Sequence, residues 1–195
     1  VARALEAGKG VATANKALVA ARGAELEALA ALHGGALRYE AAVAGAIPVL
    51  HALRGALVAN RIARVRGILN GTTNFILTRM GEDGLSLSEA LARARALGFA
   101  EADPSADLSG LDAAQKLVIL ARHAFGRWLP VESVARRGIE HLTAADLAQA
   151  ARRGGTIRLV AEGVAGDDGA AALRVEPAFL PAGDPLAGVR DEANA

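Results

Sequence analysis

The stretch GVATANKALVAARGAELEALAALHGGALRYEAAVAG, residues 10 to 45, decides the fold class. Residues 10–16 have the pattern of a short β-strand with a polar end, and residues 17–35 form an alanine-rich and leucine-rich helix pattern that stops at a glycine pair. Residues 36–45 have the pattern of a second strand. A strand, a helix and a strand at this spacing predict a βαβ unit with parallel strands, which is part of a doubly wound Rossmann sheet in an α/β protein.

The rest of the chain predicts a second domain of the α+β type, with a mixed sheet and helices on one face. Residues 61–71 alternate apolar residues loosely with arginines, as a half-exposed strand does, and the helix after them is expected to be capped by Thr72 or Thr73. The strands at 156–165 and 171–180 are expected to run antiparallel, joined by the turn GDDG. The expected helices span residues 47–60, 72–80, 86–98, 111–125 and 143–155.

The composition limits the classes of partner. The 22 basic and 21 acidic residues give a formal net charge of +1 and form no block that would bind nucleic acid. The absence of cysteine excludes disulfides and thiolate metal sites and fits a reducing compartment, so we expect a cytoplasmic protein. The longest nearly apolar run is about half the ~20 residues of a membrane-spanning helix. The sequence does not start with a signal-peptide pattern, and it stops without a helix cap or a finished strand pattern. These features predict a piece of a longer protein.

The segment AEADPSADLSGLDAAQK, residues 100 to 116, gathers acids before a helix that carries one lysine. On that helix Asp112 and Lys116 lie one turn apart, on a face roughly opposite the main apolar stripe. A surface interpretation is helix capping and an exposed ion pair that contributes ~0.3 to 0.5 kcal/mol. A catalytic interpretation is a desolvated lysine that exchanges a proton and is oriented by Asp112. A magnesium or calcium site is a third interpretation, although the spacing matches no known cation loop.

Four segments resemble the homoserine dehydrogenases in their order and spacing, and the resemblance extends over nearly the whole chain. It implies NAD(P)-dependent interconversion of L-homoserine and L-aspartate 4-semialdehyde, in threonine and methionine biosynthesis, by a homodimer. The segment of acids that ends in GLDAAQK is the most specific of the four. The segments are TANKAL (13–18), YEAAVAGAIPVL (39–50), RGILNGTTNFILTRM (66–80) and ALGFAEADPSADLSGLDAAQKLVILAR (96–122).

The resemblance also implies roles for single residues. Lys116 would be the acid and base at the substrate oxygen, with Asp112 as its partner, and Glu101 would bind the substrate ammonium. Lys16 would lie where nicotinamide and substrate meet, which agrees with the carboxyl end of a strand in a doubly wound sheet. Residues 70–74 would offer donors to the substrate carboxylate, or would simply cap the next helix. A sodium ion would be held mainly by the main-chain oxygens of Glu40, Val43, Gly45 and Ile47.

The chain also departs from the family pattern. It contains no G-x-G-x-x-G loop, so the nucleotide-binding half is expected to precede it, and the preference between NAD and NADP stays open. Ala106 stands where some relatives have an acid. We expect residues 1–45 to be the end of a Rossmann domain and residues 46–195 to be the substrate-binding, catalytic and dimerisation domain. The competing hypothesis is a non-catalytic dimerisation module of a larger, bifunctional polypeptide.

Overall fold

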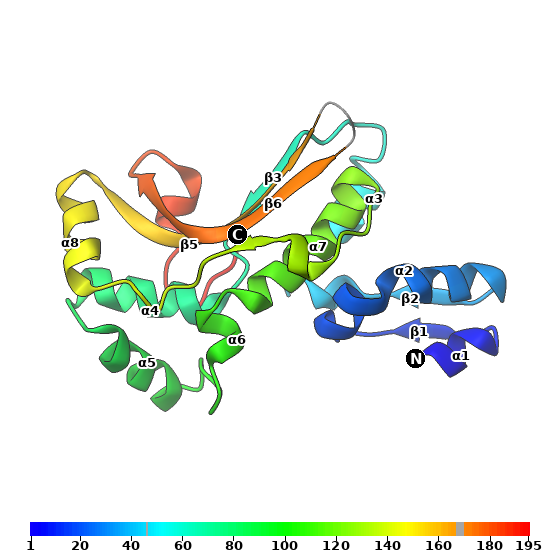
Figure 1. Cartoon of the computed structure of the whole chain (residues 1–195), viewed down its shortest axis with the longest axis horizontal. Coiled ribbons are helices and arrows are strands. Elements are labelled where there is room, and N and C mark those ends of the chain that lie inside the picture. The colour runs from blue at the N-terminus through cyan, green and yellow to red at the C-terminus, as the bar shows by residue number, and fades with distance from the viewer. Residues whose placement is uncertain (46, 167–169) are drawn as a thin grey trace. The chain divides into compact units, whose positions relative to one another are not determined.

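The computed structural model describes residues 1–45, 47–166 and 170–195, and it has the α/β class that the sequence predicts (Figure 1). The chain divides into two compact units. The first contains residues 1–65, 115–134 and 163–172, and the second contains residues 66–114, 135–162 and 173–195. The predicted domain boundary at residue 45 stays a prediction.

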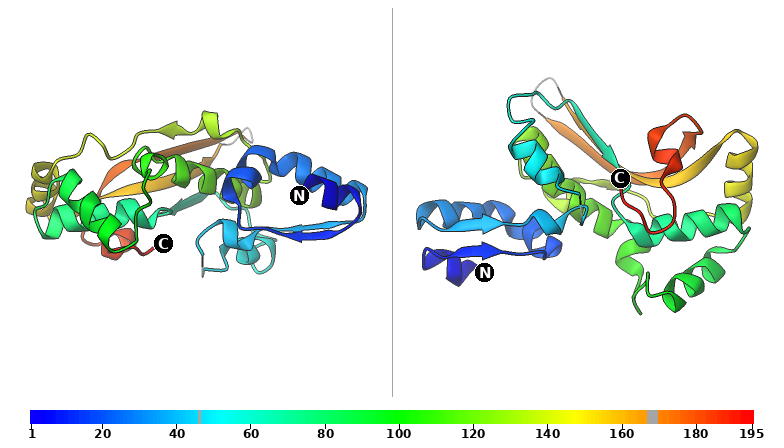
Figure 2. Two further views of the ribbon diagram at one scale, coloured as in Figure 1. Left: turned by 90° about the horizontal axis from the view of Figure 1, so that it is seen from below. Right: turned by 180° about the vertical axis from the view of Figure 1, so that it is seen from behind.

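The βαβ unit is present in the first unit. Strand β1 (Gly10–Ala12) is followed by helix α2 (Lys16–Leu32) and strand β2 (Ala36–Arg38), and the short helix α1 (Ala2–Glu6) precedes them. The two strands pair in parallel, as predicted; Val11 lies opposite Leu37, and α2 lies along the strands (Figure 2). The Asn15 side chain accepts a hydrogen bond from the Leu18 amide at 3.0 Å, which caps the first turn of α2.

Two predicted elements of this unit are shorter than the sequence suggests. The predicted strand 36–45 ends at Arg38, because Tyr39 leaves the extended conformation and buries its ring, and Glu40–Ala42 then form the 3-10 helix η1. The helix predicted over 47–60 is α3 (Val49–Arg54), which ends at Gly55. Glu40 therefore belongs to a turn, and its placement in an apolar strand was wrong.

The larger sheet has four strands in the order β3-β5-β6-β4. Strand β3 (Arg64–Gly67) is shorter than the predicted strand 61–71, because the chain turns at Asn70 to begin the next helix. The long strands β5 (Gly155–Ala165) and β6 (Ala171–Pro181) lie at the predicted positions, and β6 pairs in parallel with the unpredicted strand β4 (Ala135–Arg136). Residues 167–169 of the predicted GDDG turn lie outside the described residues.

Helices of the second unit cover one face of this sheet. Figure 1 shows α4 (Gly71–Glu82) and α8 (Ala144–Arg152) next to β5, with α5 (Leu87–Ala96) on the side of α4 that faces away from the sheet. Capping boxes at Ser86 and Thr143 start α5 and α8; the box at Thr143 follows from the sequence, which for α5 left the cap open between Ser86 and Ser88. The cap of α4 is Asn70, so the prediction of Thr72 or Thr73 was wrong.

Helix α7 (Leu111–Phe125) has the predicted bounds and is almost entirely buried in its middle. Ile119, which helical spacing puts on the same face as Asp112 and Lys116, has no exposed surface. A helix that is apolar nearly all round is typical of a core element. The remaining short helices are α6 (Ser105–Leu108), η2 (Val131–Ser133) and η3 (Pro185–Gly188). No helix in the described ranges is long and apolar enough to cross a bilayer.

Candidate functional site

A buried amide connects three elements of the second unit. The Asn70 side chain, 4% exposed, donates from Nδ2 to Asp107 Oδ1 at 2.6 Å and to Asp112 Oδ2 at 2.9 Å. Its Oδ1 accepts from the amide and the hydroxyl of Thr73, both at 2.8 Å. Because carboxylates only accept and the main-chain N–H of Thr73 only donates, the side-chain amide of Asn70 has one orientation that satisfies every partner. Asn70 therefore joins α4, α6 and the first turn of α7.

This amide fixes the acid that the sequence predicts as the partner of the catalytic lysine. Asp112 is only 6% exposed, and it lies in the first turn of α7, where the helix dipole favours a negative charge. Lys116 follows one turn later on the same helix and is half-buried. Asp107, one of the upstream acids, reaches the same amide from α6, so this acid lies near the start of α7.

The other polar residues after Asn70 bond to the chain itself. The Thr72 hydroxyl donates to the Phe99 carbonyl at 2.7 Å. Asn74 is buried and donates to the carbonyls of Val189 and Ala193 at 3.3 and 3.2 Å. Gly71 lies so close to the C-terminal segment that a Cβ there would be 2.5 Å from the Glu192 carbonyl oxygen. The geometry of this segment matches the capping interpretation.

Glu101 is placed differently from Asp112. It is exposed in the loop between α5 and α6, and it forms no hydrogen bond or ion pair with any residue that the structure describes. The structure therefore brings Asp107, Asp112 and Asn70 together and leaves the Glu101 carboxylate in solvent. The connecting role of Asn70 was missed from the sequence, where the only signal was a good capping residue before a helix.

Lys16 begins α2, directly after the carboxyl end of β1, and it is half-buried. The Asn15 amide donates to Thr13 Oγ1 at 3.1 Å, so the connection between β1 and α2 is held by its own polar side chains. Both Thr13 and Asn15 come from the TANK segment that the sequence singled out.

Glu40 caps a helix. Its Oε1 accepts from the amides of Leu50 and His51 at 2.9 and 3.1 Å, and its Oε2 lies 3.6 Å from Arg54 Nη2. The loop that carries the other predicted sodium ligands lies between η1 and α3, with Val43 buried and Gly45 and Ile47 exposed. Ala44 and Gly45 both have positive φ, 55° and 36°. No group of three His, Cys, Asp or Glu residues suited to a metal occurs within the described ranges.

A second polar cluster surrounds Tyr39 in the first unit. The Tyr39 hydroxyl donates to Glu27 at 2.6 Å and lies 2.9 Å from His123 Nε2. Arg122 and Trp128 donate to the other Glu27 oxygen, each at 3.0 Å. Burial, together with the nearby Arg54, lowers the pKa of His123 to about 4, and burial beside Glu27 raises the pKa of Tyr39. Each polar group here has a partner in the chain, so the cluster holds α2, Tyr39 and α7 together.

The model of one protein family, homoserine dehydrogenase, matches residues 48–195. The homoserine dehydrogenase of Corynebacterium glutamicum is 48% identical over 199 residues, and the enzyme of that name from Lactococcus lactis is 42% identical over 195 residues. Both alignments cover 100% of this chain and 45% of the relative. The chain thus spans about half the length of the curated relatives that it matches.

Solved structures agree with the sequence relatives. A homoserine dehydrogenase from Thiobacillus denitrificans matches with a TM-score of 0.95 at 42% identity, covering 99% of this chain and 44% of that one. A homoserine dehydrogenase from S. aureus, crystallised at pH 8.5, matches with a TM-score of 0.85 at 39% identity, covering 99% of this chain and 45% of that one.

Proposed function

Because the chain belongs to the homoserine dehydrogenase family, we propose that it supplies the substrate-binding and catalytic part of an NAD(P)-dependent enzyme. The reaction is the interconversion of L-homoserine and L-aspartate 4-semialdehyde, which serves threonine and methionine biosynthesis in a cytoplasmic homodimer. The observation that supports this most directly is the buried bond from Asn70 to Asp112, one turn before Lys116. If Asp112 and Lys116 were only a helix cap and an exposed ion pair, a buried Asn70 side chain would not be needed to hold the Asp112 carboxylate.

In this proposal Lys116 exchanges the proton of the substrate hydroxyl. Oxidation of the alcohol removes a hydride from carbon, and Lys116 in its neutral form accepts the hydroxyl proton; in the reverse direction the ammonium returns that proton. Asp112 directs the amine, and Asn70 holds the carboxylate of Asp112 in turn. A side chain fixed in this way loses less conformational freedom when the reaction geometry forms.

Glu101 is proposed to bind the substrate ammonium. Its carboxylate is exposed and makes no bond in the described part of the chain, so a cationic group meets an acceptor that needs no rearrangement. The substrate is a zwitterion, and burying its charge requires an opposite charge of this kind.

The dinucleotide is proposed to be held in part by Thr13, Asn15 and Lys16. These residues fit the group because they lie where parallel strand β1 gives way to α2, and doubly wound sheets bind ligands at the carboxyl ends of their strands. When bound, the nicotinamide supplies or accepts the hydride. In this proposal Lys16 would contact both the nicotinamide and the substrate.

A sodium ion fits the loop between η1 and α3 only through main-chain oxygens. Both oxygens of the Glu40 carboxylate are already engaged by α3 and Arg54. In this proposal the main-chain carbonyls of Glu40, Val43, Gly45 and Ile47 would be the ligands, because hard cations prefer such oxygens.

The test follows NADPH oxidation by aspartate semialdehyde, with the chain joined to the flanking sequence of its gene. We expect Lys116→Ala to lower kcat by about 10²- to 10⁴-fold, with a smaller loss in Asp112→Asn. Lys9→Ala, which changes an exposed lysine, is the matched control. Unchanged turnover in both site variants would reject the catalytic role and favour the dimerisation module. Activity that depends on a divalent metal and not on nicotinamide would reject the reaction class.

A further inference from the structure

The second unit contains a small cavity that is lined by none of the proposed substrate, cofactor or sodium residues. Its volume is about 210 Å³, and it is bordered by α4, α8, the start of β5 and the segment around η3. Its apolar wall includes Leu77 and Leu147. Its polar lining consists of Thr78, Glu82, Thr156, Arg158 and Arg190. Two guanidinium groups therefore face a space that only a small molecule could occupy.

Arg158 is a buried cation that has no carboxylate partner among the residues the structure describes. The residue is 3% exposed, and within the described chain its one hydrogen bond runs from Nη1 to Thr78 Oγ1 at 2.9 Å. Its Nε is buried and has no acceptor among the described residues. Buried charges in proteins are normally paired, because removing an ion from water is costly. Arg158 departs from that rule at the wall of a cavity.

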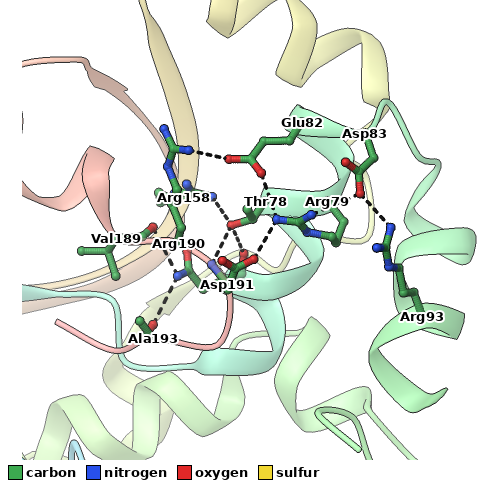
Figure 3. A network of polar contacts seen from close by, with 11 residues as sticks. Thr78, Arg79, Glu82, Asp83, Arg93, Arg158, Val189, Arg190, Asp191 and Ala193 are labelled. Atoms are coloured by element: carbon green, nitrogen blue, oxygen red, sulfur yellow. Dashed lines mark hydrogen bonds and ion pairs between the residues drawn. The ribbon is translucent and has the colours of Figure 1, made fainter. Parts of the chain in front are cut away.

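The acids nearby are already engaged by other arginines. Arg79 lies 2.9 Å from Glu82 Oε2 and 2.7 Å from Asp191 Oδ1, and Arg190 lies 2.9 Å from Glu82 Oε1. Figure 3 shows these contacts converging on α4, with Arg158 reaching Thr78. Burial, and then the positive charge of Arg190, lower the pKa of Arg158. The local electrostatics therefore favour one additional negative charge.

We propose that this cavity binds a small oxyanion, a phosphate or a carboxylate, on the Arg158 guanidinium. A guanidinium presents a planar fork of donors that matches two oxygens of such an anion, and Nε is a free member of that fork. The hydroxyl of Thr156 and the exposed side of Arg190 offer further donors, whereas the Thr78 hydroxyl already donates to the Asn74 carbonyl. The volume is below that of drug-sized ligand pockets, which limits the ligand to a few heavy atoms. The proposal is independent of the dehydrogenase reaction.

The test measures thermal unfolding of the chain in phosphate, acetate and chloride at equal ionic strength. Arg158→Met removes the buried charge with little change of volume, and Arg152→Met removes an exposed charge on the neighbouring α8. We expect phosphate or acetate to raise Tm above the chloride value in the parent and in Arg152→Met, and this increment to disappear in Arg158→Met. The phosphate and acetate series separate the two ligand classes. An equal increment in all three proteins would overturn the proposal, because kosmotropic salts such as phosphate stabilise any folded protein by being excluded from its surface.

A second measurement covers the case in which Arg158→Met does not fold. In the parent chain, the side-chain Nε–H resonances of the arginines are followed by nuclear magnetic resonance during titration with phosphate and with acetate. A saturable shift of the Arg158 resonance, without one at Arg152, supports the site. Parallel, unsaturated shifts of both resonances would reject it.

Discussion

Replacing Asn70 by alanine removes the connection between α4, α6 and α7 in a single step. The loss of the helix cap costs about 1 kcal/mol, and hydrogen bonds to charged groups contribute about 1.5 to 3 kcal/mol each when buried. Asp112 is 6% exposed and loses its Asn70 donor, whereas Asp107 is partly exposed and recovers some hydration. We therefore expect Asn70→Ala to lower the free energy of unfolding by about 3 to 5 kcal/mol, a large part of the typical total of about 5 to 15 kcal/mol.

Asn70→Asp separates the cap from the donated hydrogen bonds. Aspartate caps helices as well as asparagine does, so the cap is kept in this variant. Any loss of stability then arises because a third carboxylate replaces Nδ2, which lies 2.6 Å from Asp107 Oδ1 and 2.9 Å from Asp112 Oδ2. Like charges disfavour ionisation, so the pKa of the introduced carboxyl rises above its unfolded value in the folded state. A raised carboxyl pKa stabilises the fold at low pH, and this stabilisation is lost as the pH rises through that pKa. The variant should therefore lie closest to the parent in stability at acid pH.

Urea unfolding followed by circular dichroism measures both variants at about pH 7 and about pH 5, a range that spans the upper part of carboxyl titration. The refuting result is a loss below about 0.5 kcal/mol for Asn70→Ala, the size expected for an ordinary surface substitution. A loss in Asn70→Asp that does not depend on pH would reject the arrangement of the three polar groups, even if the alanine variant were destabilised.

Three further predictions concern other parts of the fold. Gly71→Ala should lose about 1 to 3 kcal/mol in urea unfolding, because its Cβ would lie 2.5 Å from the Glu192 carbonyl oxygen, whereas Gly183→Ala, with no atom within 4 Å of its Cβ, should lie within about 0.5 kcal/mol of the parent. The pKa of the His123 imidazole is lowered from 6.5 to about 4 in the folded chain, so between these pH values the imidazole is neutral when folded and binds a proton when unfolded. The free energy of unfolding should therefore fall as the pH drops from 6.5 to about 4. His123→Gln should flatten this pH dependence in urea unfolding, and an unchanged slope contradicts the assignment. Thr143→Ala should cost about 1 kcal/mol in thermal unfolding through loss of the α8 capping box, and Thr143→Ser, which keeps the hydroxyl, should not.

Local signals in the sequence predict the long elements well. The capping box at Thr143 and the bounds of α7 depend on side chains within a few residues, and both are present in the structure. The parallel pairing of β1 and β2 follows from the βαβ spacing in the same way. These features depend on helix propensity, capping chemistry and period, which a single sequence displays.

Features that depend on distant contacts were misplaced or missed. Strand β2 ends early because the Tyr39 hydroxyl reaches Glu27, twelve residues away in sequence, and Glu40 turns to the α3 amides. Asn70 connects to Asp112 across 42 positions, so only its cap signal was visible. Strand β4 has two residues, and it exists because β6 provides a partner. Tertiary contacts decide such features, and no local pattern encodes them.

The burial of α7 has a mechanical consequence. Seven residues in its middle are at most 7% exposed: Ala113, Ala114, Leu117, Val118, Ile119, Leu120 and Ala121. A slip by one position would turn every side chain by about 100° and drive the Lys116 amine or the Asp112 carboxylate into close-packed hydrocarbon. The buried residues therefore allow α7 only one rotational register, and the Asp112 and Lys116 side chains return to the same positions after each thermal fluctuation.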